Sequence, residues 1–86
     1  MENYQDKEKF YLTSDLKLQA FLRLMTPEFF IGLNKTNPNR ITFVFKKTEK
    51  LIELTNGYLS RKKYLISPLS LSENIEQGKA MIYGNY

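Results

Sequence analysis

Side chains able to do catalytic chemistry are scarce in this chain. It contains no cysteine and no histidine, which removes thiolate nucleophiles, imidazole bases and the usual zinc ligands. A serine nucleophile would therefore need a lysine base, and the Ser-x-x-Lys spacing occurs at residues 14–17 and 60–63. Two occurrences in unrelated segments of 86 residues show that this spacing arises easily, and Ser14 also fits a helix N-cap. The sequence therefore predicts a protein that is not an enzyme.

Carboxylate pairs are the remaining candidates for holding Mg²⁺ or Ca²⁺, which prefer oxygen ligands. Glu73 and Glu76 lie three residues apart in a predicted helix, and Asp6 and Glu8 lie in a polar segment near the start. Neither pair has a third ligand or a glycine turn beside it, which is typical of solvated surface carboxylates. The four glycines are scattered singly and form no phosphate-binding loop. We therefore predict no metal site and no cofactor.

Positive charge is concentrated in the middle third of the chain. The formal net charge is +4, yet residues 35–63 hold eight basic and only two acidic side chains. Cations beside aromatic rings can bind phosphates and stack on bases, so this segment is a candidate nucleic-acid interface. The alternative is a solvated basic surface with the tyrosines in the core. The candidate contacts are Arg40, Lys46, Lys47, Lys50, Arg61, Lys62, Lys63 and Tyr64.

Aromatic residues are abundant for a small core, with six Phe and six Tyr. Aromatic side chains left on an uncovered sheet face would form a protein-binding surface. An edge strand over residues 29–33 could also pair across a two-fold axis and stabilise a homodimer. We therefore expect a small non-enzymatic accessory protein that binds a partner protein or itself. Binding of DNA or RNA through residues 35–64 is the alternative.

The first predicted helix, residues 14–25, follows the candidate N-caps Thr13, Ser14 and Asp15 and ends before Pro27. Before it, residues 1–9 are expected to fray, and residues 10–12 could form an edge strand. Its apolar stripe is Leu18, Phe21, Leu22 and Met25. Its opposite face is expected to stay in water and carries Lys17, Gln19 and Arg23.

A hairpin follows, with strands over residues 29–33 and 40–45 joined by a loop rich in turn formers. Period-two alternation predicts that Ile41, Phe43 and Phe45 share the face toward the helices. A second helix is predicted over residues 48–60, and a third begins at Ser67-Pro68 and stops at Gly84. The basic residues lie at both ends of the second helix, about 18 Å apart.

The predicted fold class is therefore α+β in two layers, with the order (β)αββαα and one domain over residues 1–86. A small antiparallel sheet, made of the hairpin and a third edge strand, would be covered on one face by about three helices. Residues 1–9 lack the apolar core of a secretory signal, and no apolar run is long enough to span a membrane. A cytoplasmic location without membrane association is therefore expected.

Several apolar and turn motifs resemble a small family of bacteria, phages and mobile elements, domain of unknown function 5659. The motifs are residues 11–16 (YLTSDL), 20–22 (AFL), 41–45 (ITFVF), 51–54 (LIEL) and 58–59 (YL), with Tyr83 as the closing aromatic. The likeness spans residues 11–83 and implies the same fold and a phage or mobile-element origin. Where the family has a small turn after the first helix, this chain has Thr26-Pro27-Glu28-Phe29. Because the family has no assigned activity, the resemblance implies no site residue.

Overall fold

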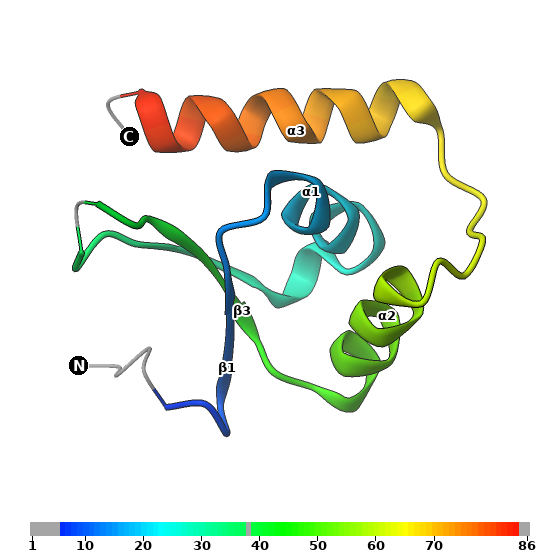
Figure 1. The fold of residues 1–86 in the computed structure, drawn as a ribbon, viewed down its shortest axis with the longest axis horizontal. Helices are drawn as coiled ribbons and strands as arrows, with labels where there is room; N and C mark the ends of the chain where they lie inside the picture. Colours follow the sequence, from blue (N-terminus) through cyan, green and yellow to red (C-terminus); the bar gives the residue numbers. More distant parts are fainter. Residues whose placement is uncertain (1–5, 38, 85–86) are drawn as a thin grey trace.

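The computed structural model describes residues 6–37 and 39–84 and contains a three-stranded antiparallel sheet and three α-helices (Figure 1). The strands are β1 (Phe10–Thr13), β2 (Phe30–Asn34) and β3 (Thr42–Lys46), with β3 in the centre of the sheet. The helices are α1 (Leu16–Met25), α2 (Glu49–Leu59) and α3 (Pro68–Tyr83), and a 3₁₀ turn, Pro27–Phe29, precedes β2. The predicted α+β class and element order are confirmed.

The central strand β3 supplies the inner layer of the core. Phe43 and Phe45 are fully buried and cluster with Phe21 of α1 and Leu51 of α2. The antiparallel pairing of β3 with both neighbours brings Tyr11 and Phe30 level with Phe45 on this side. The hairpin pairing and the helix-facing positions of Phe43 and Phe45 are therefore confirmed. Ile41 precedes the strand and is half-buried.

The opposite face of the sheet exposes no aromatic side chain among the residues that the structure describes. Val44 is fully buried there, and Phe10 is 7% exposed. Among the tyrosines and phenylalanines that the structure describes, only Tyr83 at the end of α3 is exposed. The expectation of an aromatic binding surface on the sheet is therefore wrong for this part of the chain.

Helix α1 begins at the third of the three predicted N-caps. One carboxylate oxygen of Asp15 accepts hydrogen bonds from the backbone N–H groups of Lys17 and Leu18, at 2.9 and 3.1 Å. Thr13 supports this cap, because its hydroxyl accepts from the N–H of Asp15 at 3.1 Å. Thr26 ends the helix, and both its N–H and its hydroxyl donate to the carbonyl of Leu22. These bonds satisfy backbone groups that a helix end leaves free.

Helix α3 lies along α1 (Figure 1), and hydrogen-bonded polar side chains form part of their contact. Gln19 is fully buried there, and its side-chain nitrogen donates to the carbonyls of Leu16 (2.9 Å) and Asn74 (3.1 Å). Arg23 donates to the side-chain oxygens of Gln19 (3.3 Å) and Gln77 (3.1 Å). The prediction that Gln19 and Arg23 keep this face of α1 in water is therefore wrong, because α3 covers it and supplies hydrogen-bond partners.

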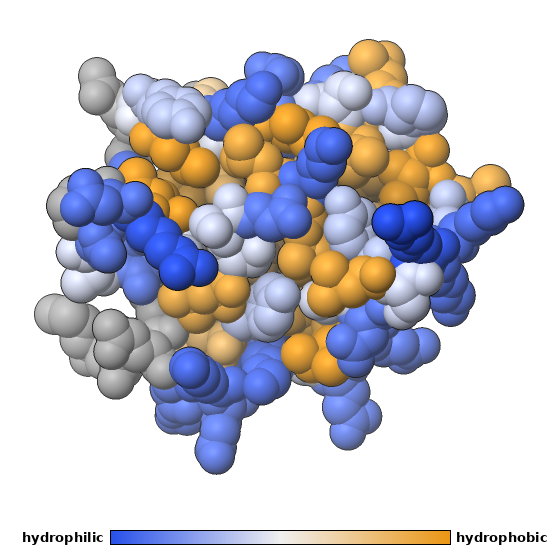
Figure 2. Space-filling view, in the orientation of Figure 1, coloured by the Kyte–Doolittle hydropathy of each residue, from blue (hydrophilic) through white to orange (hydrophobic). Residues whose placement is uncertain are grey.

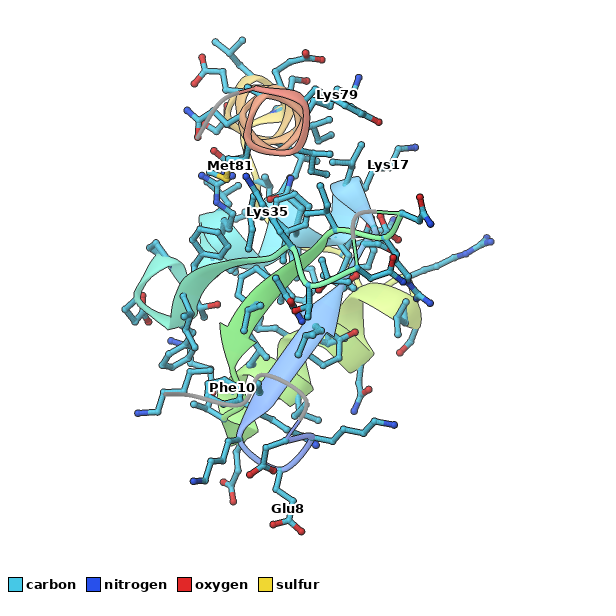
Figure 3. All side chains as sticks on the ribbon, turned by 90° about the vertical axis from the view of Figure 1, so that its left-hand side faces the viewer. Glu8, Phe10, Lys17, Lys35, Lys79 and Met81 are labelled. Carbon is cyan, nitrogen blue, oxygen red and sulfur yellow. The ribbon has the colours of Figure 1, made fainter. Side chains whose placement is uncertain are left out.

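Gly78 allows the two helices to approach closely at this contact. A β-carbon at position 78 would overlap the side-chain amide of Gln19. On the next turn, Met81 points from α3 toward the body of the protein while Lys79 points away from it (Figure 3). Met81 packs against the core cluster, whereas Lys79 forms an ion pair with Glu76 at 3.4 Å.

The chain before β1 is a hydrogen-bonded turn where the structure describes it. The N–H groups of Lys9 and Phe10 donate to the carbonyl of Asp6, at 3.1 and 3.0 Å. The first part of the predicted frayed segment, residues 1–5, lies outside the described residues. No helix in the described ranges has the length and apolar character needed to cross a membrane.

Candidate functional site

The eight predicted nucleic-acid contacts lie in three separate parts of the fold. Arg40 is exposed before β3 and lines a surface hollow with Ile82 and Tyr83 at the end of α3. Three lysines lie where β3 leads into α2, and the remaining four residues follow α2. The eleven residues of α2 separate these two groups by about 16 Å along its axis. The eight residues therefore do not form one patch.

The β3–α2 junction carries Lys46, Lys47 and Lys50 in a surrounding of mixed charge. The ammonium of Lys47 donates to the carbonyl of Lys7 at 2.8 Å, and its backbone N–H donates to the carbonyl of Lys9 at 2.9 Å. A surface hollow beside Lys47 is lined by three carboxylates, from Glu8, Glu49 and Glu53. These carboxylates lower the positive potential at this end of α2.

The other end of α2 closes with a backbone motif that turns the chain outward. The N–H of Lys62 donates to the carbonyl of Gly57 at 2.8 Å, and the N–H of Arg61 donates to that of Tyr58 at 3.1 Å. This pattern is a Schellman motif, which usually has glycine at its left-handed position. Here that position is Arg61, with φ of 64°. Arg61, Lys62 and Lys63 are all exposed beyond this turn.

Tyr64 anchors the segment between α2 and α3 rather than leaving its ring open. The ring packs against Phe21 of the core, with the centroids 4.9 Å apart. The ammonium of Lys62 lies 5.5 Å from the centroid of the same ring, and the hydroxyl lies against Gly57. Because the ring already has these contacts, the geometry does not favour base stacking by Tyr64.

Three exposed leucines surround the same connection and were missed from sequence. Leu59 ends α2, Leu65 lies between the helices and Leu69 is in the first turn of α3, with exposures of 63%, 106% and 69%. Leu65 is flanked by Tyr64 and Ile66, which both pack against the core. This alternation is the signal in the sequence, since neighbours in an extended segment point to opposite sides.

We call these leucines and the adjacent cations the linker surface, which consists of Leu59, Arg61, Lys62, Lys63, Leu65 and Leu69. Hydrophobic and hydrophilic side chains alternate along the edge of the molecule where the α2–α3 connection runs (Figure 2). The sequence has no Asp or Glu from residue 54 to residue 72. The three cations have no carboxylate partner among the residues that the structure describes. The linker surface therefore combines exposed leucines with three cations, and residues 54–72 supply no carboxylate to it.

The side chains with shifted pKa values lie around α1 and not on the linker surface. Burial, and then the charge of Asp15, raise the pKa values of Tyr11 and Tyr58. Burial lowers the pKa of Arg23 beside α3. No cluster of three acidic side chains able to hold a metal ion occurs within residues 6–37 and 39–84. These groups contribute to packing around α1 and do not form an acid–base pair.

No family model, curated protein or solved structure matches this chain.

Proposed function

We propose that this chain is a small non-enzymatic accessory protein that acts by binding another protein through the linker surface. The observation that carries this proposal is the exposure of Leu59, Leu65 and Leu69 around one connection. Exposed apolar side chains gathered in one place are a mark of interaction sites on small proteins. The absence of histidine and cysteine supports binding rather than catalysis.

A different protein is favoured over a second copy of this chain. In a two-fold dimer the same patch occurs on both subunits, so two copies of Arg61, Lys62 and Lys63 would share one interface with no carboxylate from residues 54–72 to balance them. Such like charges oppose association. Pairing through the edge strand β2 is also disfavoured, because the register shifts between Phe30 and Gly32 and leaves Ile31 in a bulge.

Site-specific photo-crosslinking in cells that naturally produce the protein tests this proposal. A benzophenone amino acid at Leu65 should form an adduct of discrete mass with one other protein, which mass spectrometry then identifies. The same probe at Ser72, which is exposed on α3, is the matched control and should not form that adduct. An adduct of the chain with itself, or equal labelling from both positions, would contradict binding of a partner at the linker surface.

Nucleic-acid binding is a second candidate because three adjacent cations lack a carboxylate partner in the described structure. Three phosphate contacts predict a slope of about −2.7 in log K against log salt on duplex DNA. Binding would then weaken about 40-fold between 50 and 200 mM salt.

Glutamine at Lys62 and Lys63 should flatten this slope by about 1.8, whereas glutamine at Lys17 and Lys79 should leave it unchanged. The slope is measured by fluorescence anisotropy with labelled duplex. A slope that is the same in both double variants would exclude the linker surface as the DNA contact.

A further inference from the structure

The linker surface is complementary to one class of protein segment. Resting on the proposed function, we infer that the partner presents an acidic segment that also carries apolar side chains. The carboxylates would face Arg61, Lys62 and Lys63, and the apolar side chains would cover Leu59, Leu65 and Leu69.

The positive charge of the linker surface has no acidic side chain in the same stretch of sequence to balance it. Residues 54–72 contain three cations and no carboxylate. The N-terminal end of α3 lies in the same stretch, beginning at Pro68, and a helix N-terminus adds partial positive charge. The β3–α2 junction also carries several lysines, among them Lys9, but Glu8, Glu49 and Glu53 lie beside them. The linker surface therefore attracts carboxylates more strongly than the other basic region does.

The backbone of the linker surface is held in place by contacts with the core. Tyr64 packs on Phe21, and Ile66 packs against the core cluster, so the linker is held on both sides of Leu65. The two hydrogen bonds that close α2 fix the direction in which Arg61 and Lys62 leave the helix. A surface that is ordered before binding loses less conformational entropy when a partner docks. The backbone that carries Leu65 and the cations is thus held by the rest of the fold and is not a loose loop.

The composition of the surface distinguishes an acidic protein segment from the other polyanions. A nucleic-acid backbone would neutralise the cations but would leave Leu65 and Leu69 against phosphates. An anionic membrane would bury the leucines together with Ser60 and Ser67, and Tyr64 points inward instead of toward a membrane interface. An acidic and apolar segment satisfies both kinds of side chain.

Selection of random displayed peptides on the immobilised full-length protein tests the inference. Enriched peptides should contain more Asp and Glu than Lys and Arg, together with large apolar residues. Binding of these peptides should weaken about tenfold or more in Lys62→Glu/Lys63→Glu, since like charges then face each other. It should also weaken in Leu65→Ser.

Matched controls are Lys17→Glu/Lys79→Glu for charge and Ile31→Ser for an exposed apolar side chain, and neither should weaken binding. Far-ultraviolet circular dichroism and the melting temperature verify that each variant is folded. The named groups are exposed, so these readings should not change.

The outcomes separate the inference from the proposed function. Peptides that depend on Leu65 but show no excess of acidic residues would overturn the acidic partner and leave the proposed function standing. No peptide that depends on Leu65 would overturn both. Vesicles of phosphatidylcholine and phosphatidylserine in equal parts, and duplex DNA, are tested at the same salt. Tighter binding to either of them, with loss in Leu65→Ser, would overturn the protein segment in favour of that ligand.

Discussion

Helix α1 contacts two surfaces of different chemistry. Toward the sheet, Phe21 lies in an apolar cluster with Phe43 and Phe45, and its ring also packs against the rings of Tyr58 and Tyr64. Toward α3, Gln19 and Arg23 form hydrogen bonds with Asn74 and Gln77, and the helices touch at Gly78. The apolar burial has no directional requirement, whereas hydrogen bonds need both partners in place. The difference indicates that the sheet side is held by apolar burial, whereas the α3 side adds hydrogen bonds that fix the position of the last helix.

Removing Phe43 tests the sheet side and should have the largest effect. Phe43→Ala would leave a cavity in a fully buried cluster and should lower the free energy of unfolding by about 3–5 kcal/mol. A small domain has a total of only about 5–15 kcal/mol, so thermal melting should show the loss clearly. Phe29→Ala, at a half-buried position, is the control and should cost less. A Phe43→Ala variant that melts within a few degrees of the original protein would show that the inner face is misassigned.

Adding a methyl group at Gly78 tests the α3 side. Gly78→Ala should destabilise the protein by about 1–3 kcal/mol, because Gln19 must move and give up its hydrogen bonds to Leu16 and Asn74. This net loss already allows for the gain of about 1 kcal/mol that alanine brings over glycine inside a helix.

Urea denaturation in a double-mutant cycle with Gln19→Ala identifies the contact, since Gly78→Ala should cost much less once the glutamine is gone. A net gain in stability for Gly78→Ala alone would contradict the prediction and show that Gln19 moves aside at little cost.

Changing Arg61 leaves both sides of α1 intact and alters only the connection that brings α3 back to it. Arg61→Gly should stabilise the protein by about 0.5–1 kcal/mol, because glycine adopts the left-handed conformation without steric cost. Lys63→Gly lacks that benefit and should not stabilise, since Lys63 has a negative φ. Melting temperatures of the two variants provide the comparison, and equal shifts would argue against strain at Arg61.

High pH should destabilise the packing on the sheet side of α1, and this effect should be smaller than those of the three substitutions. The raised pKa values of Tyr11 and Tyr58 mean that these tyrosines ionise in the unfolded chain first, near pH 10. The contribution of these two tyrosines to stability should therefore be constant below about pH 10 and be lost as pH rises through their folded-state pKa values. Tyr11→Phe should reduce the fall, whereas Tyr83→Phe, which alters an exposed side chain, should not. Urea midpoints on either side of pH 10 measure this, and an unchanged slope in Tyr11→Phe would contradict it.

Local patterns in the sequence predicted most of the fold, because they act within a few residues. The Thr26-Pro27 step ends α1, Thr48 caps α2 and Ser67 caps α3, as their side-chain chemistry dictates. The alternation around Phe43 correctly predicted which side of β3 faces the helices. What could not be predicted is burial between distant segments. Gln19 resembled a surface residue because its partners, Asn74 and Gly78, lie more than fifty positions away.

For the candidate site too, the sequence did not show how distant segments pack. The sequence identified the cations at Arg61, Lys62 and Lys63, but it did not show that Tyr64 turns inward and leaves Leu65 exposed. Leu59 seemed to belong to the apolar side of α2, and its exposure depends on where that helix meets α1 and the linker. Charge is visible in a composition, whereas the exposure of an apolar side chain is a property of the packed chain.

The bulge in β2 has a consequence for how this protein behaves when it is crowded. An outer strand with a continuous ladder of free N–H and C=O groups is a template on which further chains can add, which leads to fibrils or aggregates. In β2 the ladder is interrupted at Ile31, and Gly32 has a φ of 157° that few side chains tolerate. New strands therefore find no straight edge at the one place where this sheet exposes an isoleucine. The irregularity therefore makes the β2 edge of the sheet a poor template for the addition of further chains.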